Sequence, residues 1–186
     1  LTVKPDILPR MDFSKGIPSA SKTLVISPAM MDSEEELDRL LETMEIRFLG
    51  NRDNNLHFAL LTDFRDASAE TLAGDAALLE LAKQKISDLN KKYGRAVNDA
   101  FFIFHRPRKW NERDKVWMGY ERKRGKLSEL NALLRGRGKE NFLLIVGEEE
   151  VYSKAKYVIT LDTDTELPRD AAWNIVGAIA HPLNRA

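Results

Sequence analysis

The chain has 186 residues, 43% of them hydrophobic and 31% charged, and its formal net charge is zero. This length fits one domain with a single sizeable core, and the composition is ordinary for a soluble globular protein. The chain contains no cysteine, which excludes disulfide bonds and cysteine-based metal sites. Its longest apolar runs, such as residues 142–146, are far too short to span a bilayer.

Residues 1–22 are rich in Pro, Ser and Lys, and we expect an irregular lead-in followed by one domain over residues 23–186. An apolar, β-branched run at residues 23–27 predicts a strand that Pro28 ends. Ser33 then begins a capping box with Glu36. Apolar residues at helical spacing follow and predict an amphipathic helix, with a stripe formed by Leu37, Leu40, Leu41, Met44 and Phe48.

The same alternation of strand and helix signals continues to the end of the chain. The expected elements are a buried strand (57–62), a helix (75–93), a strand (101–104), a polar loop (106–119), a helix (121–134) and strands at 142–146 and 157–161. Pro168 is expected to open a last helix that runs to about Ala180, because proline is tolerated at the first helical position.

Strands that alternate with helices predict an α/β fold, with a mostly parallel sheet and helices on both faces. In such sheets ligands bind beyond the carboxyl ends of the strands. This rule directs attention to Pro28, Asp63, His105 and residues 162–164, each of which follows or ends a predicted strand. A carboxylate at Asp63 could accept a hydrogen bond from an N–H group such as that of uracil, or it could simply cap a turn.

The sharpest motif is Asp162-Thr163-Asp164. Two carboxylates at positions i and i+2 of an extended strand point to the same side. Hard cations such as Mg²⁺ bind carboxylate oxygens and keep water and substrate phosphates as their other ligands. The motif occurs by chance in many chains, where it is a polar turn. Its place after an apolar strand favours a metal site formed by Asp162 and Asp164.

Positive charge is concentrated in residues 105–139, which contain twelve Lys and Arg against four Asp and Glu. Such a segment indicates an anionic ligand, unless it is a solvated surface. Arg124, Gly125 and Lys126 lie in its densest part, where cations around a glycine suit a diphosphate. Nucleic-acid binding is the alternative, with tryptophans available for stacking, but the zero net charge counts against it.

The order of these features resembles that of GT-A glycosyltransferases, whose fold is Rossmann-like. The features are a strand ending at Ile26-Ser27-Pro28, a strand ending at Asp63, the segment 126–131 and the Asp162–Asp164 motif. Longer strings resemble the glycosyltransferase region of cyclic β-1,2-glucan synthases. They cover nearly the whole chain from about Pro9, and lie at residues 9–13, 47–53, 104–108, 117–126, 161–169 and 181–185.

The resemblance implies a donor-binding part of an inverting enzyme that transfers glucose from UDP-glucose to a growing β-1,2-glucan acceptor. It implies that Asp164 binds a divalent metal, Mg²⁺ or Mn²⁺, that Asp162 binds the ribose or the metal, and that Asp63 binds uracil. Arg124 and Lys126 would then lie near the diphosphate. It further implies a much larger parent protein, embedded in the inner membrane of Gram-negative bacteria, whose transferase region faces the cytoplasm.

Inverting GT-A enzymes place the catalytic base and the acceptor site after the metal motif, whereas this sequence continues for about twenty residues beyond Asp164. We therefore assign no catalytic base and expect the rest of the parent polypeptide to supply it. The chain by itself is expected to be soluble, to bind UDP-glucose weakly and to be inactive in polymerisation. A catalytically silent domain that binds a nucleotide sugar is the remaining alternative.

Overall fold

The computed structural model describes residues 8–93 and 99–184, so the first seven residues of the predicted lead-in lie outside it. Residues 8–22 form an irregular segment that contains one short 3₁₀ turn, Ser19–Ser21. The elements that follow are β1 (Thr23–Met30), α1 (Glu34–Gly50), β2 (Leu56–Asp63), α2 (Asp75–Lys92), β3 (Phe101–Arg106), β4 (Lys109–Asn111), β5 (Val116–Met118), α3 (Arg122–Leu133), β6 (Leu144–Val146), α4 (Glu149–Tyr152), β7 (Tyr157–Thr160) and α5 (Ala171–Ala180).

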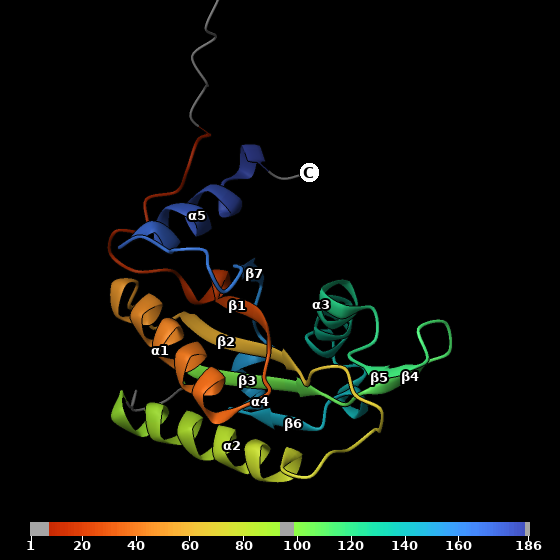
Figure 1. The fold of residues 1–186 in the computed structure, drawn as a ribbon. Helices are drawn as coiled ribbons and strands as arrows, with labels where there is room; N and C mark the ends of the chain where they lie inside the picture. The colour runs from red at the N-terminus through yellow and green to blue at the C-terminus, as the bar shows by residue number, and fades with distance from the viewer. Residues whose placement is uncertain (1–7, 94–98, 185–186) are drawn as a thin grey trace, which may run out of the picture.

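Five of these strands form one sheet in the order β6-β3-β2-β1-β7 (Figure 1). The pairs β1–β2, β2–β3 and β1–β7 are parallel, and β6 alone runs antiparallel, beside β3. This mostly parallel arrangement confirms the predicted α/β, Rossmann-like fold. It also brings the carboxyl ends of β1, β2, β3 and β7 to the same end of the sheet.

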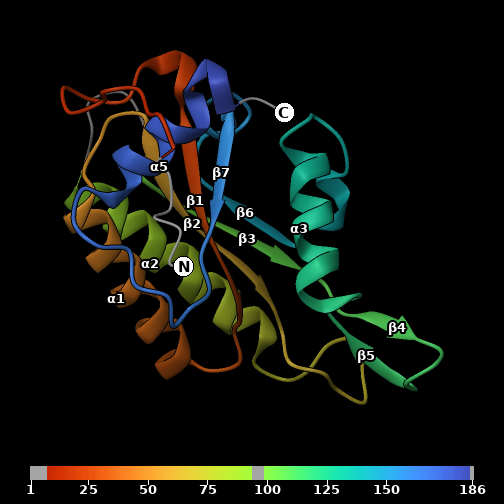
Figure 2. The same ribbon diagram turned by 90° about the horizontal axis from the view of Figure 1, so that it is seen from above.

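The core has two parts because side chains of a strand alternate between the faces of a sheet. In β2, which is buried along its whole length, Phe58 and Leu60 pack in the cluster with α1, α2 and α5. Ala59 and Leu61 point the other way and pack in the cluster with α3 and α4. Figure 2 shows α1 and α2 on one side of the sheet and α3 on the other. Helices therefore cover both faces, as predicted.

Helix α1 begins with one half of the predicted capping box, since the Glu36 carboxylate accepts hydrogen bonds from Arg39. The Ser33 hydroxyl accepts a hydrogen bond from the Glu36 amide at 3.2 Å, which satisfies one of the free N–H groups of the first turn. The predicted apolar stripe is buried in the core. Each such side chain contributes roughly 1.5–3 kcal/mol when it is fully buried.

Strand β1 continues through Pro28, which was expected to end it. Pro28 pairs in register with Leu61 of β2, whereas β7 pairs with β1 only as far as Ile26. Beyond Ile26 one side of β1 therefore faces no partner strand among the described residues. A proline is tolerated there, because its missing N–H is not needed for the ladder.

Three other expectations need correction. The last helix begins at Ala171 and not at Pro168, because Asp170 has a left-handed backbone (φ 61°) that breaks the helical path. The expected loop 106–119 contains the hairpin of β4 and β5, which projects from the body of the molecule in Figure 2. Strand β6 is shorter than predicted, at Leu144–Val146. No helix in the described ranges is long and apolar enough to cross a membrane.

Candidate functional site

A cleft of about 390 Å³ lies at the carboxyl ends of β1 and β2. One wall comes from the end of β1 (Pro28, Ala29 and Met30) and from α1. The other walls come from residues 63–66 after β2, from the start of α3 and from Thr163 after β7. The cleft thus lies where the parallel sheet was expected to bind a ligand, and it brings together Pro28, Asp63 and Lys126 of the predicted site.

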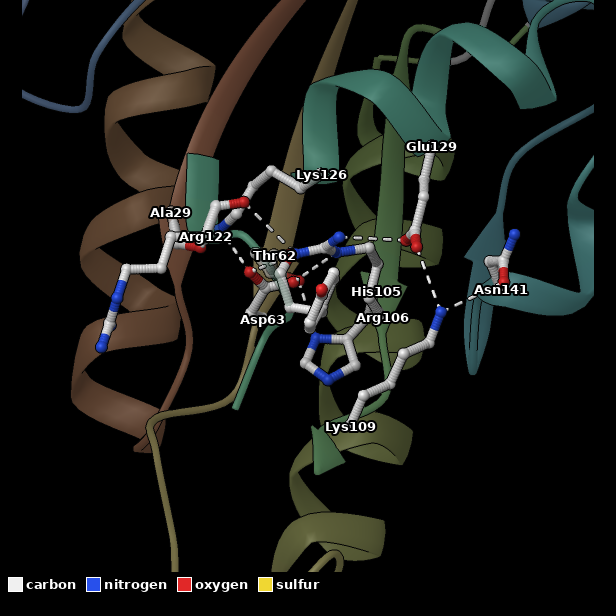
Figure 3. Close-up of polar contacts among 11 residues, drawn as sticks. Ala29, Thr62, Asp63, His105, Arg106, Lys109, Arg122, Lys126, Glu129 and Asn141 are labelled. Atoms are coloured by element: carbon white, nitrogen blue, oxygen red, sulfur yellow. Dashed lines mark hydrogen bonds and ion pairs between the residues drawn. The ribbon is translucent and has the colours of Figure 1, made fainter. Parts of the chain in front are cut away.

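Asp63 forms the floor of this cleft and is 3% exposed. Its carboxylate accepts two hydrogen bonds from the Arg106 guanidinium, at 2.8 Å (Nε to Oδ1) and 2.9 Å (Nη2 to Oδ2). The Lys126 ammonium lies 3.0 Å from Oδ2 (Figure 3). A carboxylate has about four acceptor positions, so these three contacts leave room for a further donor.

Lys126 is buried in the second turn of α3 and lies under the cleft. Its ammonium donates to the Ala29 carbonyl at 2.6 Å as well as pairing with Asp63. Burial lowers the pKa of the Lys126 ammonium, although the Asp63 carboxylate opposes this shift. Lys126 therefore connects α3 to both β1 and β2.

Arg106 lies at the end of β3 and is 2% exposed. Its Nη1 donates to Glu129 of α3 at 3.0 Å. Burial disfavours its charged form, but the hydrogen bonds and charges of Asp63 and Glu129 outweigh burial and raise the pKa of the Arg106 guanidinium. The site thus contains a compact group of two cations and two carboxylates, formed by Asp63, Arg106, Lys126 and Glu129.

Two glycines let backbone segments pack closely around this group. A side chain on Gly119 would collide with the Asp63 carboxylate, and one on Gly125 would collide with the Tyr120 carbonyl. Gly125 was predicted to let the backbone approach a diphosphate. In the structure it is the protein's own backbone, at Tyr120, that approaches it.

The cations at the start of α3 differ in their surroundings. Arg122 and Lys123 line the cleft, and they pair with Asp66 and Asp162 respectively. The Arg124 side chain is 82% exposed, pairs with Glu121 and is not among the residues that line the cleft. Arg124, for which a diphosphate contact was predicted, thus lies outside the cleft, whereas its two neighbours toward the N-terminus line it.

Asp162 and Asp164 lie in a turn after β7 and not in an extended strand. The Thr165 amide donates to the Asp162 carbonyl at 3.1 Å, which closes this turn. The alternation expected for a strand therefore does not set the direction of the two carboxylates. No cluster of three or more His, Asp or Glu that could hold a metal occurs in the described part of the chain. A cation there would rely on these two carboxylates and on ligands from the substrate.

The basic segment 105–139 is not a continuous charged surface. Arg106, Arg108 and Lys126 are buried, and each pairs with a carboxylate. Arg108 donates to the carbonyls of Arg65 (2.6 Å) and Glu70 (3.2 Å), so it holds the loop after β2. Three of the twelve basic side chains that suggested a ligand in the sequence are thus used inside the protein.

No family model matches the chain. Over 185 residues, 100% of the chain, it is 42% identical to the curated cyclic beta-(1,2)-glucan synthase NdvB of Rhizobium meliloti (strain 1021). The chain is a relative of this glucan synthase. It spans 6% of the length of that protein, and the relationship confirms the resemblance found in its sequence.

One residue that sequence analysis missed is Arg47 of α1, whose buried guanidinium contacts the turn with Asp162 and Asp164. One signal was its place in the string 47–53, one of those that carry the resemblance. An arginine close to the apolar stripe of an amphipathic helix was a clue to a buried partner, since unpaired charges are rarely buried.

We expect Asp63→Asn to destabilise the chain by about 3–5 kcal/mol, because it leaves Arg106 and Lys126 buried without their shared anion. Urea denaturation measures the change in the free energy of unfolding. The matched control is Asp66→Asn, which removes a more exposed pair with Arg122 and should cost less than about 1 kcal/mol. Equal effects of the two substitutions would contradict the importance given to the buried pair.

The stability of the folded chain should depend on pH because of His105. This histidine is fully buried beside Asp63, and its Nδ1 lies 2.8 Å from the Thr62 hydroxyl. Burial lowers its pKa from 6.5 to about 4, although Asp63 opposes this shift. Between these values the unfolded chain binds a proton that the folded chain does not, so stability should fall as the pH decreases through this window.

The expected slope from His105 is at most about 1.4 kcal/mol per pH unit. It is measured by urea denaturation at intervals from pH 6.5 to pH 4. His105→Asn should reduce this slope relative to the wild-type chain, because it removes the titrating group. An unchanged slope in the variant would show that other groups cause the acid sensitivity.

Proposed function

We propose that the chain forms the donor-binding part of an inverting glycosyltransferase, which transfers glucose from UDP-glucose to a growing β-1,2-glucan. The observation that carries this proposal is a cleft at the carboxyl ends of β1 and β2, in a chain 42% identical to a glucan synthase. Because the chain spans 6% of that relative, the activity of the complete protein is part of the proposal.

The nucleoside would occupy the part of the cleft between the end of β1 and Asp63. Pro28 and Ala29 offer an apolar wall against which a base can lie, and both line the cleft. The remaining acceptor capacity of the Asp63 carboxylate suits the N–H group of a uracil ring. Arg106 and Lys126 keep that carboxylate in place.

The diphosphate would lie at the start of α3. Arg122 and Lys123 line the cleft there, and Lys126 lies beneath it. A twelve-residue helix directs its partial positive charge toward an anion at its amino end, which adds to the charge of these side chains. Since Lys123 pairs with Asp162 in the free chain, it would exchange this carboxylate for the donor phosphates.

A divalent cation, Mg²⁺ or Mn²⁺, would be held by Asp162 and Asp164. Two exposed carboxylates in one turn fit such an ion, which binds in proteins through one or two carboxylates together with substrate phosphates. When bound, the cation would neutralise charge on the departing diphosphate. The protein's own cations, Arg122 and Lys123, would stabilise the same charge electrostatically.

In the complete enzyme, the acceptor 2-hydroxyl oxygen would bond to the anomeric carbon while the bond from that carbon to the diphosphate oxygen breaks. UDP leaves with the bonding electrons, and the hydroxyl proton passes to a base. We assign no base within this chain, and propose that the rest of the polypeptide supplies it together with the acceptor site. The role of the chain is then to bind and orient the donor.

Calorimetric titration with UDP-glucose, with Mn²⁺ and then with a chelator, tests the donor site. We expect binding to depend on the metal, and Asp164→Asn to weaken metal-dependent binding at least about tenfold, which corresponds to about 1.4 kcal/mol. Asp114→Asn in the β4–β5 hairpin is the matched control and should bind as the wild-type chain does. Binding that is unaffected by metal and by Asp164→Asn would exclude the metal site.

The position of the diphosphate is tested separately with UDP. Lys123→Ala should weaken UDP binding about tenfold, because Lys123 lines the cleft. Arg124→Ala removes a neighbouring cation whose side chain is 82% exposed, and should change the affinity by less than about twofold. The opposite order would restore the contact first predicted for Arg124 and place the diphosphate on another side of α3.

A further inference from the structure

Arg47 lies near the end of α1 and is 4% exposed, so its guanidinium is buried beneath the turn that carries Asp162 and Asp164. Its Nη1 donates to the Ser27 hydroxyl of β1 at 2.6 Å. Its Nη2 lies near three carbonyl oxygens of the turn: those of Asp162 (2.8 Å), Thr163 (3.1 Å) and Thr165 (2.6 Å). One side chain thus connects the turn to both α1 and β1.

A second set of contacts from the same end of α1 continues along the chain. The Asn51 amide nitrogen donates to the Pro168 carbonyl at 3.1 Å, and its oxygen accepts from the Ala172 amide at 3.0 Å. The Asp170 amide donates to the Gly50 carbonyl, also at 3.0 Å. The segment from the acidic turn to the start of α5 therefore rests on the last turn of α1.

The charge of Arg47 also acts on the acidic turn. Burial lowers the pKa of the Arg47 guanidinium, and the negative charge of Asp164 opposes this shift. Arg47 is thus close enough to Asp164 for the two charges to interact. It is nonetheless too buried to contact a ligand in the cleft, and it is not among the residues that line the cleft.

We propose that Arg47 is a positioning residue, which fixes the backbone of the 162–165 turn so that Asp162 and Asp164 are held ready for a divalent cation. The inference rests on the proposed function, because it assigns these carboxylates to a metal. Lysine cannot replace Arg47 in this role. A single ammonium on a flexible stem does not reproduce a planar guanidinium whose nitrogens reach a hydroxyl and three carbonyls together.

Loss of these hydrogen bonds should affect the two halves of the site differently. The turn would lose its connection to α1, so Asp162 and Asp164 would be ordered only when the cation binds, at a cost in affinity. Asp63 and Lys126 on the other side of the cleft are held by Arg106 and the Ala29 carbonyl, which Arg47 does not contact in the described structure. Metal affinity should therefore fall while metal-free nucleotide affinity is retained.

The first experiment is amide hydrogen exchange on the whole chain, as wild type and as Arg47→Lys. We expect at least about tenfold faster exchange in residues 162–165 of the variant, which Arg47 holds, and unchanged exchange in β2 and α2. Arg52→Lys is the matched control, since Arg52 lies just beyond α1 and stacks over the Phe48 and Tyr93 rings. Native exchange rates in the Arg47→Lys turn would overturn the inference.

The second experiment is titration of the same proteins with Mn²⁺, alone and with saturating UDP, followed by the paramagnetic signal of the free ion and corrected for binding to UDP itself, and with UDP in the presence of a chelator. Arg47→Lys should weaken Mn²⁺ binding about tenfold and leave metal-free UDP binding within about twofold of wild type. Unchanged Mn²⁺ affinity, or an equal loss for both ligands, would overturn the positioning role. Failure of the wild-type chain to bind Mn²⁺ even with UDP present would instead overturn the metal site of the proposed function, and the inference with it.

Discussion

The carboxylate of Asp63 is the contact on which the candidate site depends. Asp63 ends the central strand β2, and its two oxygens hold Arg106 from β3 and Lys126 from α3. Lys126 extends the connection to β1 through the Ala29 carbonyl. Three strands and one helix from distant parts of the sequence therefore meet at a single buried anion. Each ionised group of this cluster is tolerated inside the protein only because the others neutralise it.

Buried arginines hold the irregular backbone around the cleft. A parallel sheet leaves the loops at its carboxyl ends without ladder partners, yet their buried carbonyls still need donors. Arg47 supplies donors to the turn after β7, and Arg108 to the loop after β2. Arg47 belongs to α1, and Arg108 lies between β3 and β4. The guanidinium suits this role because it has five donors and no acceptor. The loops around the cleft thus gain order from helix α1 and from the residues that follow β3.

The sequence predicted the type and order of the main elements because burial on both faces makes β1, β2 and β3 continuous apolar runs, and because the helix stripe is strongly periodic. It also directed attention to the correct end of the sheet. It did not distinguish Lys123, whose side chain is half-exposed, from Lys126, which is buried, since that difference depends on how α3 packs. It missed Arg47 for the same reason, as the three carbonyls that it contacts lie more than 110 residues away in the sequence.

Gly119 and Gly125 limit how residues 119–125 can change during evolution. Gly119 packs against Asp63, and Gly125 packs against the Tyr120 carbonyl within the same segment, so the chain between the two glycines is tightly folded and held to β2. Helix α3 turns by about 100° per residue. Inserting or deleting one residue between the glycines would rotate the following side chains around the helix, and would exchange those that face the cleft for those that face water. The length of residues 119–125 should therefore vary less among functional relatives than the identity of the exposed side chains within it.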